Sequence, residues 1–410
     1  TENDNIAIGY DAMTTNTAGG QYNIAIGNYA GDAITSGDNN TIMGHNVASN
    51  LTTGGNNTAM GMDALLATVS HNNSTAIGYQ ALRANIAADN TAVGKDALAL
   101  NTTGSTNTAV GAAALDANTT AEYNTAIGAY ALSGATTGSY NCALGRSAGL
   151  AITTGTRNVV VGVDALKAVT TGVNNTAIGT NALAAATGGE SVAVGKAALA
   201  TMTTAVRNTA VGTEALTANT TGYNNTAIGY VAGKAMTEGY QNTLIGDRAG
   251  TAITTGDNNT AVGQNALKTA TTANENTAIG WDALTLNTSG SGNTAVGSGV
   301  MAANTTGAEN TAVGSDALDA NTEGDENTAI GMGAMGANTT GEYNTSVGKS
   351  SMAANTTGNH NVAVGRNAMN QNTTGVRNIA IGSHSYDASD TEDDNMAIGS
   401  DAMTVNTAGG

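Results

Sequence analysis

The sequence predicts an all-β fold, a parallel β-solenoid or β-roll with about 24 rungs, each built from one repeat of 17 residues. Three observations predict this fold. A short motif recurs at a nearly constant spacing, each copy carries a brief alternating segment bounded by turn residues, and the apolar side chains are mostly small or aliphatic.

The recurring motif is Asn-Thr-Ala-Ile/Val-Gly, which ends on a glycine 24 times between Gly9 and Gly399. The spacing is 17 residues except after Gly9, where it is 18, and after Gly78 and Gly179, where it is 16. The consensus N-T-A-I-G-x-x-A-L-x-x-N-T-T-G-x-x defines repeat positions 1 to 17. Because no linker interrupts the pattern, we expect residues 1–410 to form one continuous array without separate domains or terminal caps.

Each element of the repeat follows from local pattern. The alternation in N-T-A-I-G, closed by glycine, predicts a short strand and a tight turn, and the A-L-x-x-N-T-T-G half predicts a second short strand or a helical turn. With strands about 4.8 Å apart, the rungs would extend over roughly 115 Å as a rod.

Composition narrows the possible functions. The chain has 55 Gly, no Pro, no Phe and one Trp, so any core must be thin. The net charge of −18 disfavours nucleic acid, because phosphate binding needs Lys and Arg. No apolar run approaches the roughly 20 residues of a membrane span. The chain starts at Thr1 without Met, which we interpret as a processed or excerpted chain.

Variation between repeats predicts which positions face inward. Position 2 is usually Thr, and its apolar exceptions lead us to expect a buried site that shares a face with position 4. These exceptions are Ile6, Ile24, Cys142, Val159, Val192, Val362, Ile379 and Met396. Position 3 is Ala in 20 of 24 repeats, and we expect this opposite face to pack against other chains, three around an axis. We expect Cys142 to be a small buried apolar residue with no catalytic role.

A correlated exchange links positions 9 and 12. In five repeats the usual Leu or Met at position 9 is small and the usual Asn at position 12 is large and apolar. The pairs are Gly31 with Ile34, Ala48 with Leu51, Gly149 with Ile152, Gly233 with Met236, and Gly250 with Ile253. Because a cavity in a packed rung is costly, we expect the two positions to fill one space.

Two further positions have clear expectations. Position 1 is Asn in 22 repeats, with Ser74 and Ser191 as exceptions, and we expect its amides to form a ladder from rung to rung. Positions 6 and 7 vary freely and should face water, which makes Trp281 an exposed aromatic residue.

The chain carries fragments of chemical motifs, but none assembles into a site. The G-x-G-x-x-G at 331–336 is part of a repeat and lacks a βαβ unit. The histidines His45, His71, His360 and His384 lack metal-ligand spacing, and the 383–387 stretch places Ser, His and Asp in sequence without evidence of triad geometry. We therefore assign no catalytic, cofactor-binding or metal-binding residue and expect no enzyme and no cofactor.

Two repetitive features of the surface need interpretation. Acidic residues recur at position 7, which we attribute to solubility and repulsion between rods; they are Asp11, Asp63, Asp96, Asp164, Asp282, Asp316 and Asp401. Asn-Thr-Thr forms N-glycosylation sequons, which we interpret as by-products of the repeat, at Asn101, Asn118, Asn219, Asn304, Asn338, Asn355 and Asn372.

The string N-T-A-V-G-x-x-A-L-x-x-N-T-T-G resembles the repeats of bacterial and phage tail-fibre-domain proteins over essentially the whole chain. The stretch Ser191-Val192-Ala193-Val194-Gly195 is similar to the head motif of trimeric autotransporter adhesins, whose repeat is shorter. Both resemblances imply a homotrimeric extracellular fibre, and neither carries catalytic residues to transfer.

The first and last twenty residues are nearly the same, and Thr-Ala-Gly-Gly follows Asn only at 16–20 and 406–410. We expect an excerpt of a longer repetitive chain, or else subunits that stack end to end.

From these features we expect an extracellular, cell-surface or virion fibre that acts as a stiff spacer or filament and associates with itself. The alternative is the shaft of a phage tail fibre or bacterial adhesin that binds a cell-surface receptor or glycan. An ice-binding solenoid ranks behind both, because the position 2 threonines are expected inside.

Overall fold

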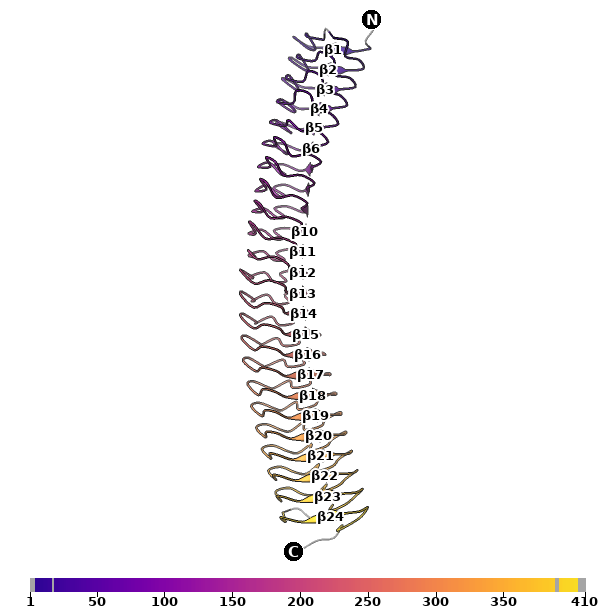
Figure 1. Cartoon of the computed structure of the whole chain (residues 1–410), viewed down its shortest axis with the longest axis vertical. Helices are drawn as coiled ribbons and strands as arrows, with labels where there is room; N and C mark the ends of the chain where they lie inside the picture. Colours follow the sequence, from indigo (N-terminus) through magenta and orange to yellow (C-terminus); the bar gives the residue numbers. More distant parts are fainter. Residues whose placement is uncertain (1–3, 17, 388–390, 405–410) are drawn as a thin grey trace. The chain divides into compact units, whose positions relative to one another are not determined.

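The computed structural model describes residues 4–16, 18–387 and 391–404, in two compact halves, Thr1–Val206 and Arg207–Gly410, each of which is described by itself. The described part of each half contains twelve three-residue strands, one per repeat, and they follow one another along the chain (Figure 1). The described residues contain no helix, and therefore none that could cross a membrane.

The strands occupy repeat positions 2 to 4 throughout. In the first half they are β1 (Ile6–Ile8), β2 (Ile24–Ile26), β3 (Thr41–Met43), β4 (Thr58–Met60), β5 (Thr75–Ile77), β6 (Thr91–Val93), β7 (Thr108–Val110), β8 (Thr125–Ile127), β9 (Cys142–Leu144), β10 (Val159–Val161), β11 (Thr176–Ile178) and β12 (Val192–Val194). In the second half they are β13 (Thr209–Val211), β14 (Thr226–Ile228), β15 (Thr243–Ile245), β16 (Thr260–Val262), β17 (Thr277–Ile279), β18 (Thr294–Val296), β19 (Thr311–Val313), β20 (Thr328–Ile330), β21 (Thr345–Val347), β22 (Val362–Val364), β23 (Ile379–Ile381) and β24 (Met396–Ile398).

Within each half, consecutive strands pair in parallel and place equivalent repeat positions side by side. In β17 and β18, for example, Thr277 pairs with Thr294 and Ala278 with Ala295. The predicted parallel β-solenoid of about 24 turns, with about 17 residues per turn, is therefore confirmed.

The rest of each turn is neither a second strand nor a helical turn. Four positions in every regular repeat have positive φ, which bends the chain sharply. In one repeat these are Gly280 at +141°, Asp282 at 55°, Leu284 at 51° and, one position before the next Asn, Gly292 at 70°. Leu284 adopts the left-handed conformation although it is strained. Two contacts offset the strain: its side chain is fully buried, and its N–H donates to the carbonyl of Val300 in the next turn at 3.0 Å.

The core of each turn contains the position 3 and position 8 alanines and the position 9 leucine. Ala278, Ala283 and Leu284 are all fully buried, whereas Ile279 at position 4 is 38% exposed. The sequence-based assignment of the two strand faces was therefore wrong. Position 3 lines the core of the chain's own turn, and positions 2 and 4 point outward, because the core is thin enough to require a methyl group opposite each leucine.

The expected exchange between positions 9 and 12 is confirmed. A Cβ atom added at Gly31 would lie 2.8 Å from Ile34 Cδ1, and one at Gly250 would lie 2.9 Å from Ile253 Cδ1. Position 3 takes part as well, because a Cβ at Gly250 would also lie 2.7 Å from Leu244. Large residues at position 3 thus compensate for glycine at position 9, which explains an exception to the alanine row.

The predicted asparagine ladder is also present. The side chain of Asn293 donates to Asn276 Oδ1 at 3.2 Å and to the Gly307 carbonyl at 2.9 Å, and its backbone N–H donates to Asn276 Oδ1 at 3.0 Å. A second ladder at position 12 was not predicted. In it, Asn321 Nδ2 donates to Asn304 Oδ1 at 2.9 Å. Both ladders are buried, so they satisfy polar groups that would otherwise be left unpaired inside the turn.

All three irregular repeat lengths are absorbed at the exposed corner around position 14. The position 12 amide normally reaches a carbonyl three residues on, as in Asn101 to Gly104. It reaches two residues on in the short repeat, from Asn85 to Ala87, and four residues on in the long repeat, from Asn16 to Gly20. The strands therefore stay in register despite insertions and deletions.

Candidate interaction surface

The outward side chains at positions 2 and 4 of β1–β24 form a surface that we call the outer strand face. Its aliphatic row is substantially exposed: Ile127, Ile228 and Ile330 keep 39%, 39% and 41% of their area in contact with solvent. Within the described residues, no strand contains a charged side chain. An exposed, uncharged apolar strip of this extent is typical of interaction surfaces.

The threonines of this face differ from those at position 13. Position 13 hydroxyls donate to the next turn, as Thr305 Oγ1 does to the Thr322 carbonyl at 2.9 Å. In β14–β21, the position 2 hydroxyls make no side-chain hydrogen bond within the described part of the chain. They point outward, so the expectation of an internal threonine row was wrong. That expectation was the reason for ranking an ice-binding solenoid behind the other functions, and the reason no longer holds.

Cys142, at position 2 of β9, lies on the outer strand face and is a free, exposed thiol. The expectation that it is buried was wrong for the same reason as the assignment of the faces. Its neighbour Ala143 is the residue that faces the core.

The corners of the turns carry the charged and aromatic side chains. At positions 16 and 17, equivalent residues stack on successive turns: Tyr123 on Tyr140 and Tyr223 on Tyr240, each pair with centroids 5.1 Å apart. The Asp257 carboxylate beside Tyr240 raises the pKa of that phenol. At position 6, Trp281 is 56% exposed, as predicted.

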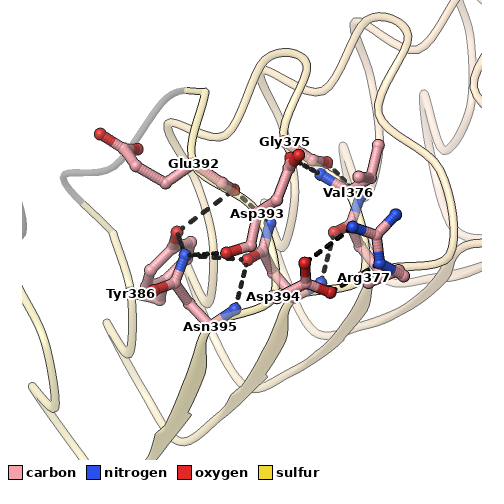
Figure 2. Close-up of polar contacts among 10 residues, drawn as sticks. Gly375, Val376, Arg377, Tyr386, Glu392, Asp393, Asp394 and Asn395 are labelled. Atoms are coloured by element: carbon pink, nitrogen blue, oxygen red, sulfur yellow. Dashed lines mark hydrogen bonds and ion pairs between the residues drawn. The ribbon is translucent and has the colours of Figure 1, made fainter. Parts of the chain in front are cut away.

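A polar cluster lies at the corner between β22 and β24 (Figure 2). Arg377 donates to both carboxylate oxygens of Asp394, at 2.6 and 2.7 Å, and this hydrogen bonding lowers the pKa of Asp394. Asn395 Nδ2 donates to the hydroxyl of Tyr386 at 2.7 Å. Tyr386 is fully buried at position 9, where most repeats have Leu or Met, and this substitution was the sequence signal that we missed.

These contacts are structural ties between adjacent turns. The Val376 N–H donates to Asp393 Oδ1 at 2.9 Å, and the Asp394 N–H donates to the Val376 carbonyl at 3.1 Å (Figure 2). The cluster therefore fixes a corner rather than surrounding a reacting group.

The Ser, His and Asp residues of 383–387 do not form a triad. His384 Nδ1 lies 3.0 Å from Asp387 Oδ2, but its Nε2 lies 2.8 Å from Arg366 rather than beside a serine hydroxyl. The hydroxyl of Ser385 donates to the Gly382 carbonyl at 2.9 Å.

The other motif fragments are explained by their positions in the turn. Gly331 is the position 5 glycine, at φ +135°, and Gly333 is a position 7 residue, at +62°. The sequon asparagines at position 12 are fully buried, out of reach of a glycosylating enzyme once the chain has folded. Among the described residues, no three His, Cys, Asp or Glu side chains gather in a way that could hold a metal ion. The repeated Thr-Ala-Gly-Gly at 406–410 lies outside the described residues.

Comparison with protein-family models and with curated proteins gives no match to the chain. The solenoid class is thus defined by the fold itself.

Proposed function

We propose that the chain is a structural fibre protein that acts as a stiff spacer or filament outside the cell or on a virion. The observation that carries this proposal is the in-register parallel strand pairing from turn to turn within each half, reinforced by the asparagine ladders. Parallel strand pairs join successive turns within each half, the position 1 asparagines add a ladder along most of them, and position 12 asparagines add a second ladder in some runs of turns, so a bend would break several bonds at once.

Nearly equivalent turns suit a mechanical role because each one is held by the same contacts. The backbone contributes at every corner: the N–H of Asp316 donates to the Ser298 carbonyl at 3.0 Å, and that of Glu309 to the Ser291 carbonyl at 2.9 Å. The resemblance to tail-fibre-domain repeats supports the same proposal.

The test is to image filaments that carry the chain, after antibody labelling of intact cells or virions. The proposal expects label along straight extracellular fibres. Label confined to the cell interior would contradict it.

A second candidate function is the shaft of a receptor-binding phage fibre or bacterial adhesin. The exposed aromatic stacks favour it, because Tyr123 and Tyr140 present 48% and 55% of their area on one corner and could contact a glycan or protein. Replacing both tyrosines with Ser should then reduce binding to host cells without changing the fold. Unchanged binding would remove this support.

A further inference from the structure

We propose that the outer strand face is a self-association surface on which a second copy of this chain packs its own outer strand face. The inference rests on the proposed fibre function and specifies the partner. It replaces the sequence-based idea that the alanine face meets the partner, because that face is inside the turn.

The first argument is electrostatic. Each copy carries a net charge of −18, so two copies repel each other through most approaches. The charged side chains are on the corners, as in the exposed pair Arg377 and Asp394. Since none of the strands β1–β24 in the described part of the chain contains a charged residue, contact through their positions 2 and 4 opposes no carboxylates directly.

The second argument is periodicity. Every strand presents the same two side-chain rows, and neighbouring strands are about 4.8 Å apart. A second copy has the same spacing on the same face. Once one turn of the first copy is aligned with one turn of the second, the neighbouring turns of the two copies are aligned as well. Irregular repeat lengths do not disturb this, because the extra or missing residue lies at the position 14 corner.

The third argument is chemical. The aliphatic row gains from being covered, since residues such as Leu144 and Ile228 are 47% and 39% exposed. The free position 2 hydroxyls can both donate and accept, and a second copy supplies hydroxyls at the same spacing. A partly polar, uncharged face can therefore be covered without unpaired charges.

The fourth argument is area. Twelve strands about 10 Å long and about 4.8 Å apart give each half roughly 580 Å² of outer strand face. Two such faces packed together bury about 1,150 Å² in total, which is the size of a weak or transient interface, and each chain carries two halves with this face.

The test measures the mass of the full chain by light scattering after size-exclusion chromatography. A face variant replaces six position 4 residues with Lys: Val93, Val110, Ile127, Val262, Ile279 and Val296. A matched control places six Lys at exposed position 14 sites of the same turns: Thr103, Thr120, Thr137, Thr272, Ser289 and Thr306. Circular dichroism checks that both variants keep the fold.

We expect the wild-type chain and the control to have a mass at least twice 40.2 kDa, and the face variant to fall to 40.2 kDa. Native Cys142 gives an independent measure within the same face. Its alkylation by a maleimide should slow at least tenfold as the wild-type chain associates, and it should not change with the concentration of the face variant.

A wild-type chain that stays at 40.2 kDa at every concentration would overturn the inference, and so would a folded face variant that keeps the wild-type mass. Unchanged Cys142 reactivity in associated material would overturn it too, by placing the contact elsewhere. A monomer that shapes ice crystals would assign the face to ice instead. None of these results contradicts the fibre function itself, which depends on labelled filaments.

Discussion

The position 5 glycine is predicted to be irreplaceable, and one repeat offers a matched comparison. Gly331 and Gly333 are two residues apart, and both have positive φ, +135° and +62°. A Cβ at Gly331 would lie 2.6 Å from both the carbonyl carbon and oxygen of Gly348 in the next turn. A Cβ at Gly333 would meet only Ser350 Oγ, at 3.9 Å.

These distances set the expected magnitudes. Gly331→Ala combines an overpacked backbone contact, about 1–3 kcal/mol, with a φ that non-glycine residues avoid, about 1–3 kcal/mol more. Gly333→Ala carries only the left-handed cost of about 1–2 kcal/mol, offset by about 0.4–1 kcal/mol from a stiffer unfolded chain. Alanine already occupies position 7 natively, at Ala113 with φ 52°.

The assay is native-state hydrogen exchange of the full chain, because a repeat protein need not unfold in a single step. The reporter is the Gly348 N–H, which donates to the Ile330 carbonyl at 2.7 Å beside the expected clash. A loss of at least about 2 kcal/mol should speed its exchange roughly 30-fold in Gly331→Ala. Equal exchange in the two variants would refute the argument that the next turn's backbone requires this glycine.

Three other perturbations follow from the same geometry. Leu318→Gly and Asn321→Ile should each lower the free energy of unfolding in urea by about 2–4 kcal/mol. The double variant should lose at least about 1 kcal/mol less than the sum of the two single losses, because the isoleucine fills the space that the leucine leaves. Additive losses would contradict the shared space. Deleting Thr306, at the exposed position 14 corner, should leave the circular dichroism and the melting temperature nearly unchanged. Deleting Ala312 from β19 should lower the melting temperature. An equal fall in melting temperature for both deletions would contradict the idea that the corner absorbs changes in repeat length. Arg377 holds the pKa of Asp394 low by hydrogen bonding. The contribution of this pair to the stability of the fold is therefore present above the ordinary aspartate pKa, and it is lost as the pH falls through the pKa of Asp394 in the folded chain. Arg377→Gln should move the carboxyl titration of Asp394, followed by NMR, to higher pH. Because both groups are exposed, added salt should reduce the difference between the Asp394 titrations of the wild-type chain and the variant. An Asp394 titration that does not move in the variant would contradict the pairing.

Much of the fold could be predicted because the repeat compares the chain with itself. The period, the strand at positions 2 to 4, the exchange of Gly250 with Ile253 and the position 1 ladder all follow from patterns within the sequence. The remaining half of the turn could not be predicted, since buried leucines with positive φ oppose local preference and are held only by contacts with adjacent turns.

The assignment of faces failed for a specific physical reason. Apolar residues at position 2, such as Val159 and Cys142, were taken to be in the core, although an outer face that meets a partner favours the same residues. The alanine common at position 3 was taken as a contact between chains, although a core one methyl group thick favours it opposite Leu at position 9. The pattern of substitutions between repeats indicates that a position is in apolar contact, but it does not distinguish the core of the same chain from contact with another chain.

The polar cluster at the corner between β22 and β24 was missed because its partners lie one turn apart. Arg377 and Asp394 are 17 residues apart, which is a contact distance only once the turns are stacked. Tyr386 in place of the usual Leu was visible in the sequence, but its partner Asn395 belongs to the ordinary position 1 row.

The most direct test of the fibre account is cryo-electron microscopy of the native material that carries the chain. The account predicts straight filaments with an axial spacing of about 4.8 Å from stacked parallel strands. In cross-section, the alanine row should be enclosed within each chain, with the threonine and aliphatic rows outside. Compact particles without that axial spacing, or filaments whose alanine rows face outward, would contradict it.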